Sequence, residues 1–369
     1  MSLLLFANTA TAIEIVKEQW GSIEDKPVWL YTLENNNGMK VKVTNWGAYT
    51  VAIETPDKHG KFADIILGYD TFEQYHQDCC YNGAVVGRYA NRIAQGQFAI
   101  DGKQHQLTTN NGGPEKVNHL HGGTVGFNKH LWQSRIVDNS IEMTYISPDG
   151  EQGYPGNLVA QLIYQLGEDN ELSLTFIADT DQATPINLIS HAYYNLTGTS
   201  ANIESHHLMI DADKTTEVGE YLIPTGKFLA VKGSPFDFRQ AKRIGKDIRS
   251  AHPQLKLAGG REEDFGGYDH NWVLNNDSES TLPNAELYEP ISGRLMQVFT
   301  TQPGIHVYTG NFMNGSVIGK LGKAMEYRSG VAIETQHFPD SPNHKHFPNT
   351  ILLADQTYIE QTVYKFSVK

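Results

Sequence analysis

The stretch VWLYTLENNNGMKVKVT, residues 28–44, decides the fold class. Its second half alternates apolar Met39, Val41 and Val43 with polar residues, which places the apolar side chains on one face of an extended chain. The Asn-rich residues 35–38 favour a turn, and another apolar run precedes them. The stretch therefore predicts a hairpin of two half-buried antiparallel strands.

The same pattern recurs along the chain and predicts further hairpins. Residues 98–107 contain Asp-Gly between two short runs, residues 158–178 contain a Gly-Glu-Asp-Asn turn, and residues 141–147 are followed by Pro-Asp-Gly. Helical patterns are scarce and are confined to residues 71–77 and 240–250. We therefore predict an all-β protein, a large antiparallel β-sandwich of two packed sheets with a few short helices.

The predicted domain organisation follows from the lack of linkers in the sequence. No Gly/Ser/Pro-rich segment or repeat divides residues 13–369, so a single β-sandwich domain is predicted for that range. Residues 1–12 carry a short apolar run followed by small residues, without a basic start, and are interpreted as a leader or a cloning remnant. We predict a cytoplasmic location. The alternative is a periplasmic or secreted protein whose signal peptide has been trimmed.

Composition narrows the class of partner. Hydrophobic residues make up 39% of the 369 residues and charged residues 19%, which is typical of a globular chain, and no window has the length of a membrane span. The formal net charge of −13, without a Lys/Arg cluster, disfavours binding to nucleic acid. We expect a neutral small-molecule partner, no membrane, and a monomer or a homodimer.

The two cysteines of the chain, Cys79 and Cys80, are neighbours in the sequence. A disulfide between adjacent residues is sterically awkward, so no disulfide framework is expected. A reducing compartment is therefore permitted.

A candidate general base follows the apolar run of residues 330–333. Val331 and Ile333 suit a buried strand, and Pro339 fits the loop beyond it. We therefore expect Glu334 to emerge at the end of this strand, on a rigid support, where a carboxylate can accept a proton. The alternative is a solvated glutamate at the end of a strand.

Two polar segments supply hydrogen-bonding groups. Asn91 and Arg92, within GRYANRIA, offer donors suited to hydroxyl groups, although an arginine here also suits a surface ion pair. In NHLHGG, an extended chain would place His119 and His121 on one face, and the paired glycines allow a ligand to approach. A metal site is the competing function for these histidines. We predict none, because no cysteine or carboxylate at metal-site spacing accompanies them.

Two further segments add a histidine and a carboxylate. His191 lies among apolar and aromatic residues in PINLISHAYYNL, as a buried structural histidine or as a general acid whose pKa is set by nearby carboxylates. Asp269, in GGYDHNWVL, either caps a turn or holds sugar hydroxyls beside Tyr268 and Trp272. The combination indicates a carbohydrate site.

These segments together resemble the aldose 1-epimerase (galactose mutarotase) family. The similarity covers roughly residues 82–366 and keeps the family's order of the motifs NRI, LHGG, HAYYNL, DHNW and ETQ. The resemblance implies the galactose mutarotase-like supersandwich fold and no cofactor. It also implies interconversion of the α and β anomers of free aldohexoses such as galactose and glucose.

The resemblance assigns roles to individual residues. Glu334 matches the general base, His191 the general acid, and His121 a histidine that assists at the ring oxygen. The residues that match sugar binders are Asn91, Arg92 and Asp269. His306 is a departure, since a glutamine that contacts the sugar is expected there in many relatives, and it leaves the preferred aldose open.

The implied chemistry needs two proton-transfer groups. A base removes the proton of the hydroxyl at C1 while an acid protonates the ring oxygen, and reclosure from the other face of the carbonyl gives the other anomer. No dinucleotide loop, P-loop or activated Ser or Cys motif is evident, in agreement with a cofactor-free reaction. In the free enzyme we expect Glu334 to be ionised and His191 protonated, with the pKa of His191 raised by nearby negative charge.

Three other functions compete with this prediction. A non-catalytic carbohydrate-binding protein would use Asp269 without needing Glu334 and His191 together. A hexose-6-phosphate 1-epimerase would need additional basic residues around the phosphate, and the acidic chain has no obvious cluster of them. A glycosidase would need paired carboxylates flanking a glycosidic bond.

Overall fold

Antiparallel strands form nearly all of the regular structure in the computed structural model, which describes residues 13–261, 264–275 and 281–369. All strand pairs of the three large sheets are antiparallel. The α-helices in these described ranges are α1 (Phe72–His76) and α2 (Pro253–Leu257). The all-β prediction is confirmed, whereas the proposed leader or cloning remnant, residues 1–12, lies outside the described residues.

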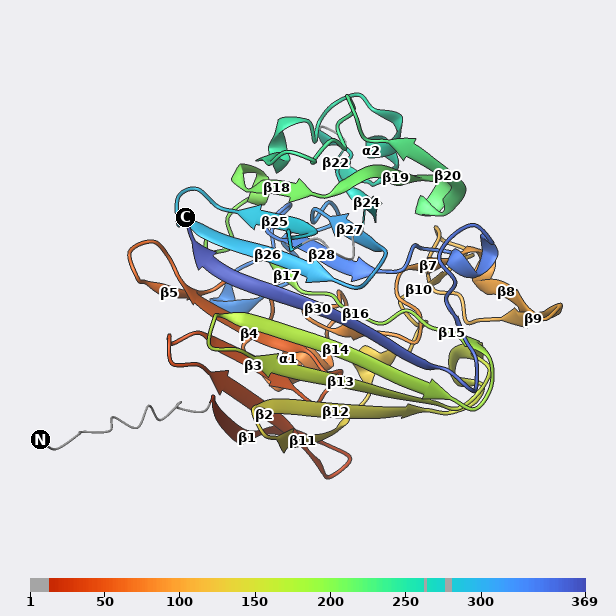
Figure 1. Ribbon diagram of the computed structural model, residues 1–369, viewed down its shortest axis with the longest axis horizontal. Helices are drawn as coiled ribbons and strands as arrows, with labels where there is room; N and C mark the ends of the chain where they lie inside the picture. Colours follow the sequence, from red (N-terminus) through yellow and green to blue (C-terminus); the bar gives the residue numbers. More distant parts are fainter. Residues whose placement is uncertain (1–12, 262–263, 276–280) are drawn as a thin grey trace, which may run out of the picture.

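The largest sheet has nine strands and crosses the whole molecule (Figure 1). Its order is β11 (Gln133–Val137), β12 (Ser140–Ser147), β13 (Leu158–Leu166), β14 (Glu171–Thr180), β30 (Thr357–Val368), β26 (Arg294–Thr300), β25 (Ala285–Tyr288), β18 (His207–Ile210) and β21 (Lys242–Arg243). The predicted hairpin within residues 158–178 is the pair β13 and β14, and the predicted strand 141–147 is β12.

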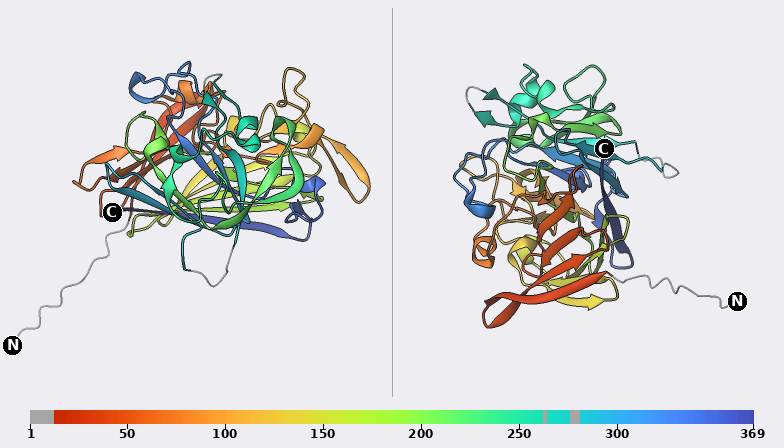
Figure 2. Two further views of the ribbon diagram at one scale, coloured as in Figure 1. Left: turned by 90° about the horizontal axis from the view of Figure 1, so that it is seen from above. Right: turned by 90° about the vertical axis from the view of Figure 1, so that its left-hand side faces the viewer.

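Two further sheets lie on one side of the nine-stranded sheet (Figure 2). The six-stranded sheet has the order β17 (Tyr193–Tyr194), β28 (Val331–Gln336), β27 (Gly304–Tyr308), β24 (Asp269–Leu274), β19 (Ala212–Val218) and β20 (Pro224–Ala230). The five-stranded sheet has the order β1 (Glu14–Ile23), β2 (Lys26–Glu34), β3 (Lys40–Thr44), β4 (Thr50–Pro56) and β5 (Phe62–Asp64). The arrangement is a two-layer sandwich of large antiparallel sheets.

The main hydrophobic core combines side chains from both layers. Val41 of β3 and Ile333 of β28 belong to the same buried cluster as Leu162 of β13. A hydrogen bond of 2.7 Å between the hydroxyls of Thr335 on β28 and Thr362 on β30 also crosses between the layers. Burial of these apolar faces stabilises the sandwich, because each removes apolar surface from water.

The hairpin predicted from the deciding stretch is confirmed by the structure. β2 pairs with β3 in antiparallel register, with Leu33 opposite Val41. Met39 and Val41 are fully buried, while Lys40 and Lys42 are partly exposed. The hairpin predicted within residues 98–107 is also present, as β8 (Gln97–Ile100) and β9 (Lys103–Gln106).

One of the two predicted helices is confirmed and the other is wrong. α1 begins after Thr71, whose side chain forms a capping box with Gln74. The predicted helix at residues 240–250 is instead strand β21 followed by a 3₁₀ turn at Ile244–Lys246. β21 pairs with β18 at the edge of the nine-stranded sheet, so tertiary pairing overrides the local helical pattern there.

Two short strand pairs bring distant segments to the six-stranded sheet. β7 (Arg92–Ile93) pairs with β10 (His119–Leu120), and β6 (Val85–Val86) pairs with β16 (Ile189–Ser190). β17 follows β16 and joins the edge of β28. Within the described ranges, none of the helices has the length and apolar character required to cross a membrane.

Candidate active site

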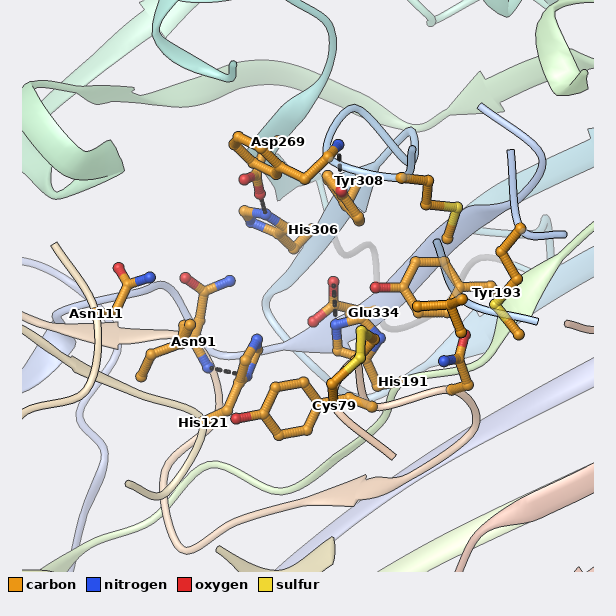
Figure 3. A pocket seen from close by; sticks show the side chains of 18 of the residues that line it. Cys79, Asn91, Asn111, His121, His191, Tyr193, Asp269, His306, Tyr308 and Glu334 are labelled. Atoms are coloured by element: carbon orange, nitrogen blue, oxygen red, sulfur yellow. Dashed lines mark hydrogen bonds and ion pairs between the residues drawn. A yellow bond between two sulfur atoms is a disulfide. The ribbon is translucent and has the colours of Figure 1, made fainter. Parts of the chain in front are cut away.

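The residues predicted to form the site meet in one cavity of about 360 Å³ (Figure 3). They come from six segments that are far apart in the sequence. The predicted residues that line the cavity are Asn91, Arg92, His121, His191, Asp269, His306 and Glu334. The two short strand pairs and the six-stranded sheet thus gather all of them around a single space.

Glu334 reaches the cavity because of the alternation along β28. Ile333 points into the hydrophobic core, and the hydroxyl of Thr335 forms a hydrogen bond with Thr362 on the same side of the strand. Glu334, between them in the sequence, therefore faces the other way. The strand continues through Gln336, so the expectation that Glu334 stands at the end of the strand is wrong. Glu334 lies directly opposite His306 of β27, and the residue is 1% exposed.

Glu334 and His191 form the closest acid–base pair in the cavity. The distance from Glu334 Oε1 to His191 Nε2 is 3.6 Å. Burial, together with the negative charge of Asp269, raises the pKa of Glu334 well above its usual value. Burial lowers the pKa of His191 to about 4. The expected upward shift of the His191 pKa is therefore wrong, because burial disfavours the imidazolium more than the surrounding carboxylates favour it.

His121 is held in one tautomer by the backbone of Asn91. The backbone N–H of Asn91 donates to His121 Nδ1 at 3.1 Å, and the backbone N–H of His121 donates to the backbone carbonyl of Asn91 at 3.1 Å. Because Nδ1 accepts a hydrogen bond, the neutral imidazole carries its hydrogen on Nε2. Burial and the nearby His191 lower the pKa of His121 well below its usual value, so the ring is a neutral N–H donor.

The cavity also brings together three side chains of metal-binding type. One ligand atom from each of His121, His191 and Glu334 lies within 4.8 Å of the others. A metal ion binds an imidazole nitrogen that carries no hydrogen, and its ligand histidines usually donate their other N–H to a second group. His121 has the reverse arrangement, since its Nδ1 accepts a hydrogen bond from Asn91. The geometry therefore fits a proton donor better than a metal ligand.

Asp269, His306 and Arg92 form a charged cluster beside the acid–base pair. His306 Nε2 lies 2.6 Å from Asp269 Oδ1, and Arg92 Nη2 lies 3.5 Å from Asp269 Oδ2. Burial alone would raise the pKa of Asp269, but the charge of Arg92 and the hydrogen bond from His306 outweigh it and lower the pKa to about 2. Asp269 is thus a fixed negative charge, and His306 donates Nε2–H to it.

Five buried polar atoms of the residues that line the cavity have no hydrogen-bond partner within the described part of the protein. They are Asn82 Oδ1, Arg92 Nε, His191 Nδ1, His306 Nδ1 and Glu334 Oε2. Buried polar groups are rarely left unpaired, because each lost hydrogen bond costs free energy. A ligand with several hydroxyl groups would satisfy atoms of this kind.

His119 does not take part in the cavity, although alternation placed it on the same face as His121. His121 has a positive φ of 51°, so the chain is not extended there and the two rings diverge. His119 Nδ1 donates to the carbonyl of Thr108, and its Nε2 accepts from the hydroxyl of Tyr154, both at 2.6 Å. His119 is therefore a buried structural histidine.

The sequence reasoning missed several aromatic residues that line the cavity. Tyr193 and Tyr308 each lie two positions after a predicted site residue, His191 and His306, and alternation could have identified them. Tyr308 also accepts a hydrogen bond of 2.8 Å from the backbone N–H of Phe312 at the rim. No local pattern in the sequence pointed to Phe312, which is 61% exposed.

Cys79 and Cys80 also line the cavity, and they are joined by a disulfide. The expectation that these neighbours do not form a mutual disulfide is therefore wrong. The turn that carries them is held by hydrogen bonds to Asp78, a tertiary arrangement that the sequence spacing did not reveal.

Known proteins of the same architecture are similar to this chain over almost its full length. The family model for aldose 1-epimerase matches residues 30–365. Galactose mutarotase from Bos taurus is 41% identical over 349 residues, which cover 93% of this chain and 97% of that protein. Aldose 1-epimerase from Escherichia coli strain K12 is 35% identical over 348 residues, which cover 93% of this chain and 96% of that protein.

The similarity extends to solved structures. Galactose 1-epimerase from Lactobacillus acidophilus superposes with a TM-score of 0.82 at 29% identity, and 97% of this chain and 99% of that chain are covered. The fold and the cavity define a two-layer β-sandwich protein with a buried carboxylate and histidines in a sugar-sized pocket. The chain belongs to the aldose 1-epimerase family, as its motifs predicted.

Proposed function

We propose that the protein is an aldose 1-epimerase that interconverts the α and β anomers of free aldohexoses, with galactose and glucose as substrates. The observation that carries the proposal is the pairing of Glu334 with His191 at 3.6 Å inside a cavity rich in hydrogen-bonding groups. Family membership supports the same reaction, because relatives that are 35% and 41% identical over most of the chain carry the names aldose 1-epimerase and galactose mutarotase.

In this proposal Glu334 is the general base and His191 the general acid. Glu334 removes the proton of the hydroxyl at C1 as His191 protonates the ring oxygen, the bond between C1 and the ring oxygen breaks, and an open-chain aldehyde forms. Rotation about the C1–C2 bond and reclosure from the other carbonyl face give the second anomer. Since both reacting oxygens are bonded to C1, the base and the acid must be close neighbours, which the structure supports.

The remaining polar residues hold the sugar. The neutral Nε2–H of His121 is a donor suited to assist at the ring oxygen. Asp269 accepts from hydroxyl groups and keeps its charge because Arg92 and His306 stabilise it. The residues proposed to bind the sugar are Asn91, Arg92, Asp269 and His306.

The charge of the cavity argues against a phosphorylated sugar. Among the described residues that line it, Arg92 alone is a lysine or arginine, and Arg92 is already paired with Asp269. Phosphate groups are usually bound by several basic side chains or backbone N–H groups. The alternative of a hexose-6-phosphate 1-epimerase is therefore disfavoured.

The proposed activity is tested by dissolving pure α-glucose or α-galactose and recording the optical rotation. The protein is expected to accelerate the approach to equilibrium beyond the spontaneous rate for both free sugars. Glucose 6-phosphate serves as the matched comparison, and no acceleration is expected for it. Sugar binding without acceleration of either free sugar would instead establish the alternative of a non-catalytic carbohydrate-binding protein.

The organisation of the protein is part of the same proposal. Residues 13–369 form one domain, since the nine-stranded sheet combines strands from β11 to β30. The enzyme needs no cofactor and works as a monomer or a homodimer. The cytoplasm is the proposed compartment, and a periplasmic or secreted location is the alternative that the Cys79–Cys80 disulfide favours, because disulfides persist in oxidising compartments.

A further inference from the structure

The Cys79–Cys80 disulfide is part of the cavity wall. Cys79 and Cys80 line the same cavity as Glu334 and His191, and the sulfur pair is visible among the lining side chains in Figure 3. Cys79 is exposed, so a reductant in solution can reach the bond. These are the two cysteines of the whole chain, and any effect of a disulfide reductant on this protein must therefore act through this bond.

The turn that follows the disulfide is anchored at its base by Asp78. Asp78 Oδ1 accepts hydrogen bonds from the Cys80 N–H at 3.0 Å and the Tyr69 hydroxyl at 2.7 Å. Asp78 Oδ2 accepts from the Asn82 N–H and the Tyr49 hydroxyl, both at 3.0 Å. The carboxylate thus fixes the chain on both sides of Tyr81.

Tyr81 links this turn to the two histidines of the site. Its φ of 59° is in the left-handed region, and Tyr81 lines the cavity. The Tyr81 ring lies 4.8 Å from the His121 ring and 5.9 Å from the His191 ring, between ring centres. Tyr81 is therefore in a position to hold both imidazoles in place.

The backbone after Tyr81 is also bonded to His191. The Gly83 N–H donates to the His191 carbonyl at 3.0 Å, and the His191 N–H donates to the Ala84 carbonyl at 2.8 Å. The distance along the chain from Cys80 to this pair of hydrogen bonds is only a few residues. A change in the backbone at Cys79 and Cys80 can therefore reach the backbone and the ring of His191.

We propose that the Cys79–Cys80 disulfide is a positioning element of the active site, which holds Tyr81 against His121 and His191 and thereby makes the activity sensitive to thiols. The proposal rests on the proposed epimerase function. A dithiol reductant transfers two electrons and two protons to the S–S bond, which leaves two cysteine thiols and converts the dithiol into its own cyclic disulfide. Loss of the bond frees the backbone of both cysteines, and small displacements of positioned catalytic groups are costly in rate.

The first test compares the oxidised protein, the same protein reduced with dithiothreitol, and the double variant Cys79→Ser/Cys80→Ser. Reduction is expected to lower kcat for galactose anomer interconversion by roughly 10-fold, with a smaller change in KM. The reason is that the imidazole rings of His121 and His191 take part in proton transfer rather than in binding alone. Reoxidation should restore kcat. The double variant should have the low kcat and should not respond to dithiothreitol, and its melting temperature separates this effect from misfolding.

Two results would overturn the proposal. One is a denatured, unreduced sample of the air-oxidised protein with two titratable thiols per chain, since the bond would then not exist. The other is a fully reduced protein whose kcat and KM equal those of the oxidised protein.

A second measurement is independent of activity. In NMR spectra of protein labelled at histidine, reduction should shift the ring signals of His121 and His191. The signal of His105, which stacks on Phe98 at 5.2 Å and does not line the cavity, is the internal control and should not move. Unchanged signals from His121 and His191 would refute the positioning role. An oxidised protein that shifts these signals on reduction but never accelerates anomer interconversion would instead refute the epimerase function alone.

Discussion

At the scale of single residues, the pKa values of Glu334 and His191 are shifted in opposite directions. Catalysis needs the carboxylate of Glu334 and the imidazolium of His191, yet burial raises the pKa of Glu334 and lowers the pKa of His191 to about 4. Between these two pKa values the pair is neutral, with its one proton on Glu334, and it carries the same number of protons as the competent ionic pair. Sugar binding needs only to shift one proton within the pair.

Replacement of the proposed base tests its role directly. Glu334→Gln should lower kcat by about 10²–10⁴-fold while sugar binding changes only a few-fold, because the amide keeps the shape but accepts no proton. Steady-state kinetics by polarimetry and sugar titration measure the two effects. Glu360→Gln is the matched control, since Glu360 is a partly buried glutamate outside the cavity, bonded to Thr301, and its kcat should equal that of the wild type.

The pH dependence of kcat/KM should show which group has which pKa. The pair is singly protonated between the two pKa values, so a bell-shaped profile is expected, with the acidic limb near pH 4 set by His191 and the alkaline limb set by Glu334. In His191→Asn only the base remains, and residual activity should rise with pH at a midpoint well above 4.5. In Glu334→Gln only the acid remains, and residual activity should fall as the pH rises through about 4. A rise in His191→Asn at or below pH 4.5 would contradict the raised pKa of Glu334.

His306 should influence which aldose is preferred. Its Nε2–H donates to Asp269, and its Nδ1 is buried without a hydrogen-bond partner among the described residues. If Nδ1 contacts a sugar hydroxyl, His306→Gln should change the ratio of kcat/KM for galactose and glucose by an amount equivalent to about 1–3 kcal/mol. An unchanged ratio, equal to that of a His105→Gln control, would place His306 outside the contacts with the sugar.

At the scale of elements, the turn after β10 depends on glycine. Gly122 has a φ of 81°, and a Cβ there would overlap the carbonyl oxygen of Gly87. Gly102, in the hairpin of β8 and β9, has a φ of 79°, and among the described residues no atom beyond its chain neighbours lies within 4 Å of an added Cβ. The two positions have nearly the same positive φ and differ in the space available to a Cβ.

This pair of glycines gives a matched test of packing at the turn that carries His121. Gly102→Ala should cost only the left-handed conformation, about 1–2 kcal/mol of the free energy of unfolding. Gly122→Ala should cost roughly 1–3 kcal/mol more, since the backbone must move to relieve the overlap. Urea denaturation of both variants measures the difference. Equal losses would show that the turn relaxes without strain.

At the scale of the whole molecule, the structure suits catalysis by proton transfer within a rigid sandwich. The cavity is built on β24, β27 and β28, and the other side of β28 is packed into the core between the sheets. Strands fixed in this way hold their side chains in place, so the cavity is preformed. Nothing in the reaction we propose requires an electron carrier or an activated nucleophile.

The behaviour of the whole enzyme towards metals follows from the tautomer of His121. Exhaustive chelation with EDTA followed by dialysis should leave kcat/KM unchanged. The reason is that the imidazole of His121 carries its hydrogen on Nε2, so this nitrogen is an N–H donor rather than a metal ligand. Polarimetry before and after chelation measures this. Loss of activity that zinc restores would contradict the proposal and make His121, His191 and Glu334 a metal site.

Much of this architecture was contained in local sequence patterns. The alternation of Met39, Val41 and Val43 predicted a strand with one buried face, and the structure buries those side chains. Thr71 and Gln74 form the capping box that starts α1 where a helix was expected. Patterns of this kind are readable because they depend on neighbours along the chain, through the period of the backbone or a single turn.

The remaining features depended on contacts between distant segments. Residues 240–250 became an edge strand and a 3₁₀ turn because β18 was available as a partner. Local alternation placed His119 beside His121, but the positive φ of His121 separates their rings. No sequence pattern showed that Cys79 and Cys80 bond to each other in the cavity wall.

The sequence by itself determined the all-β class, the family, and the seven predicted polar residues of the cavity, because each of these follows from local periodicity or from motifs. Only the tertiary structure decided the chemistry of those residues. It buried Glu334 and His191 together, fixed the tautomer of His121 on the backbone of Asn91, and kept Asp269 ionised. The physical reason is that a pKa or a tautomer depends on burial, charges and hydrogen bonds from segments far apart in the chain, which have no signature in the sequence around any one residue.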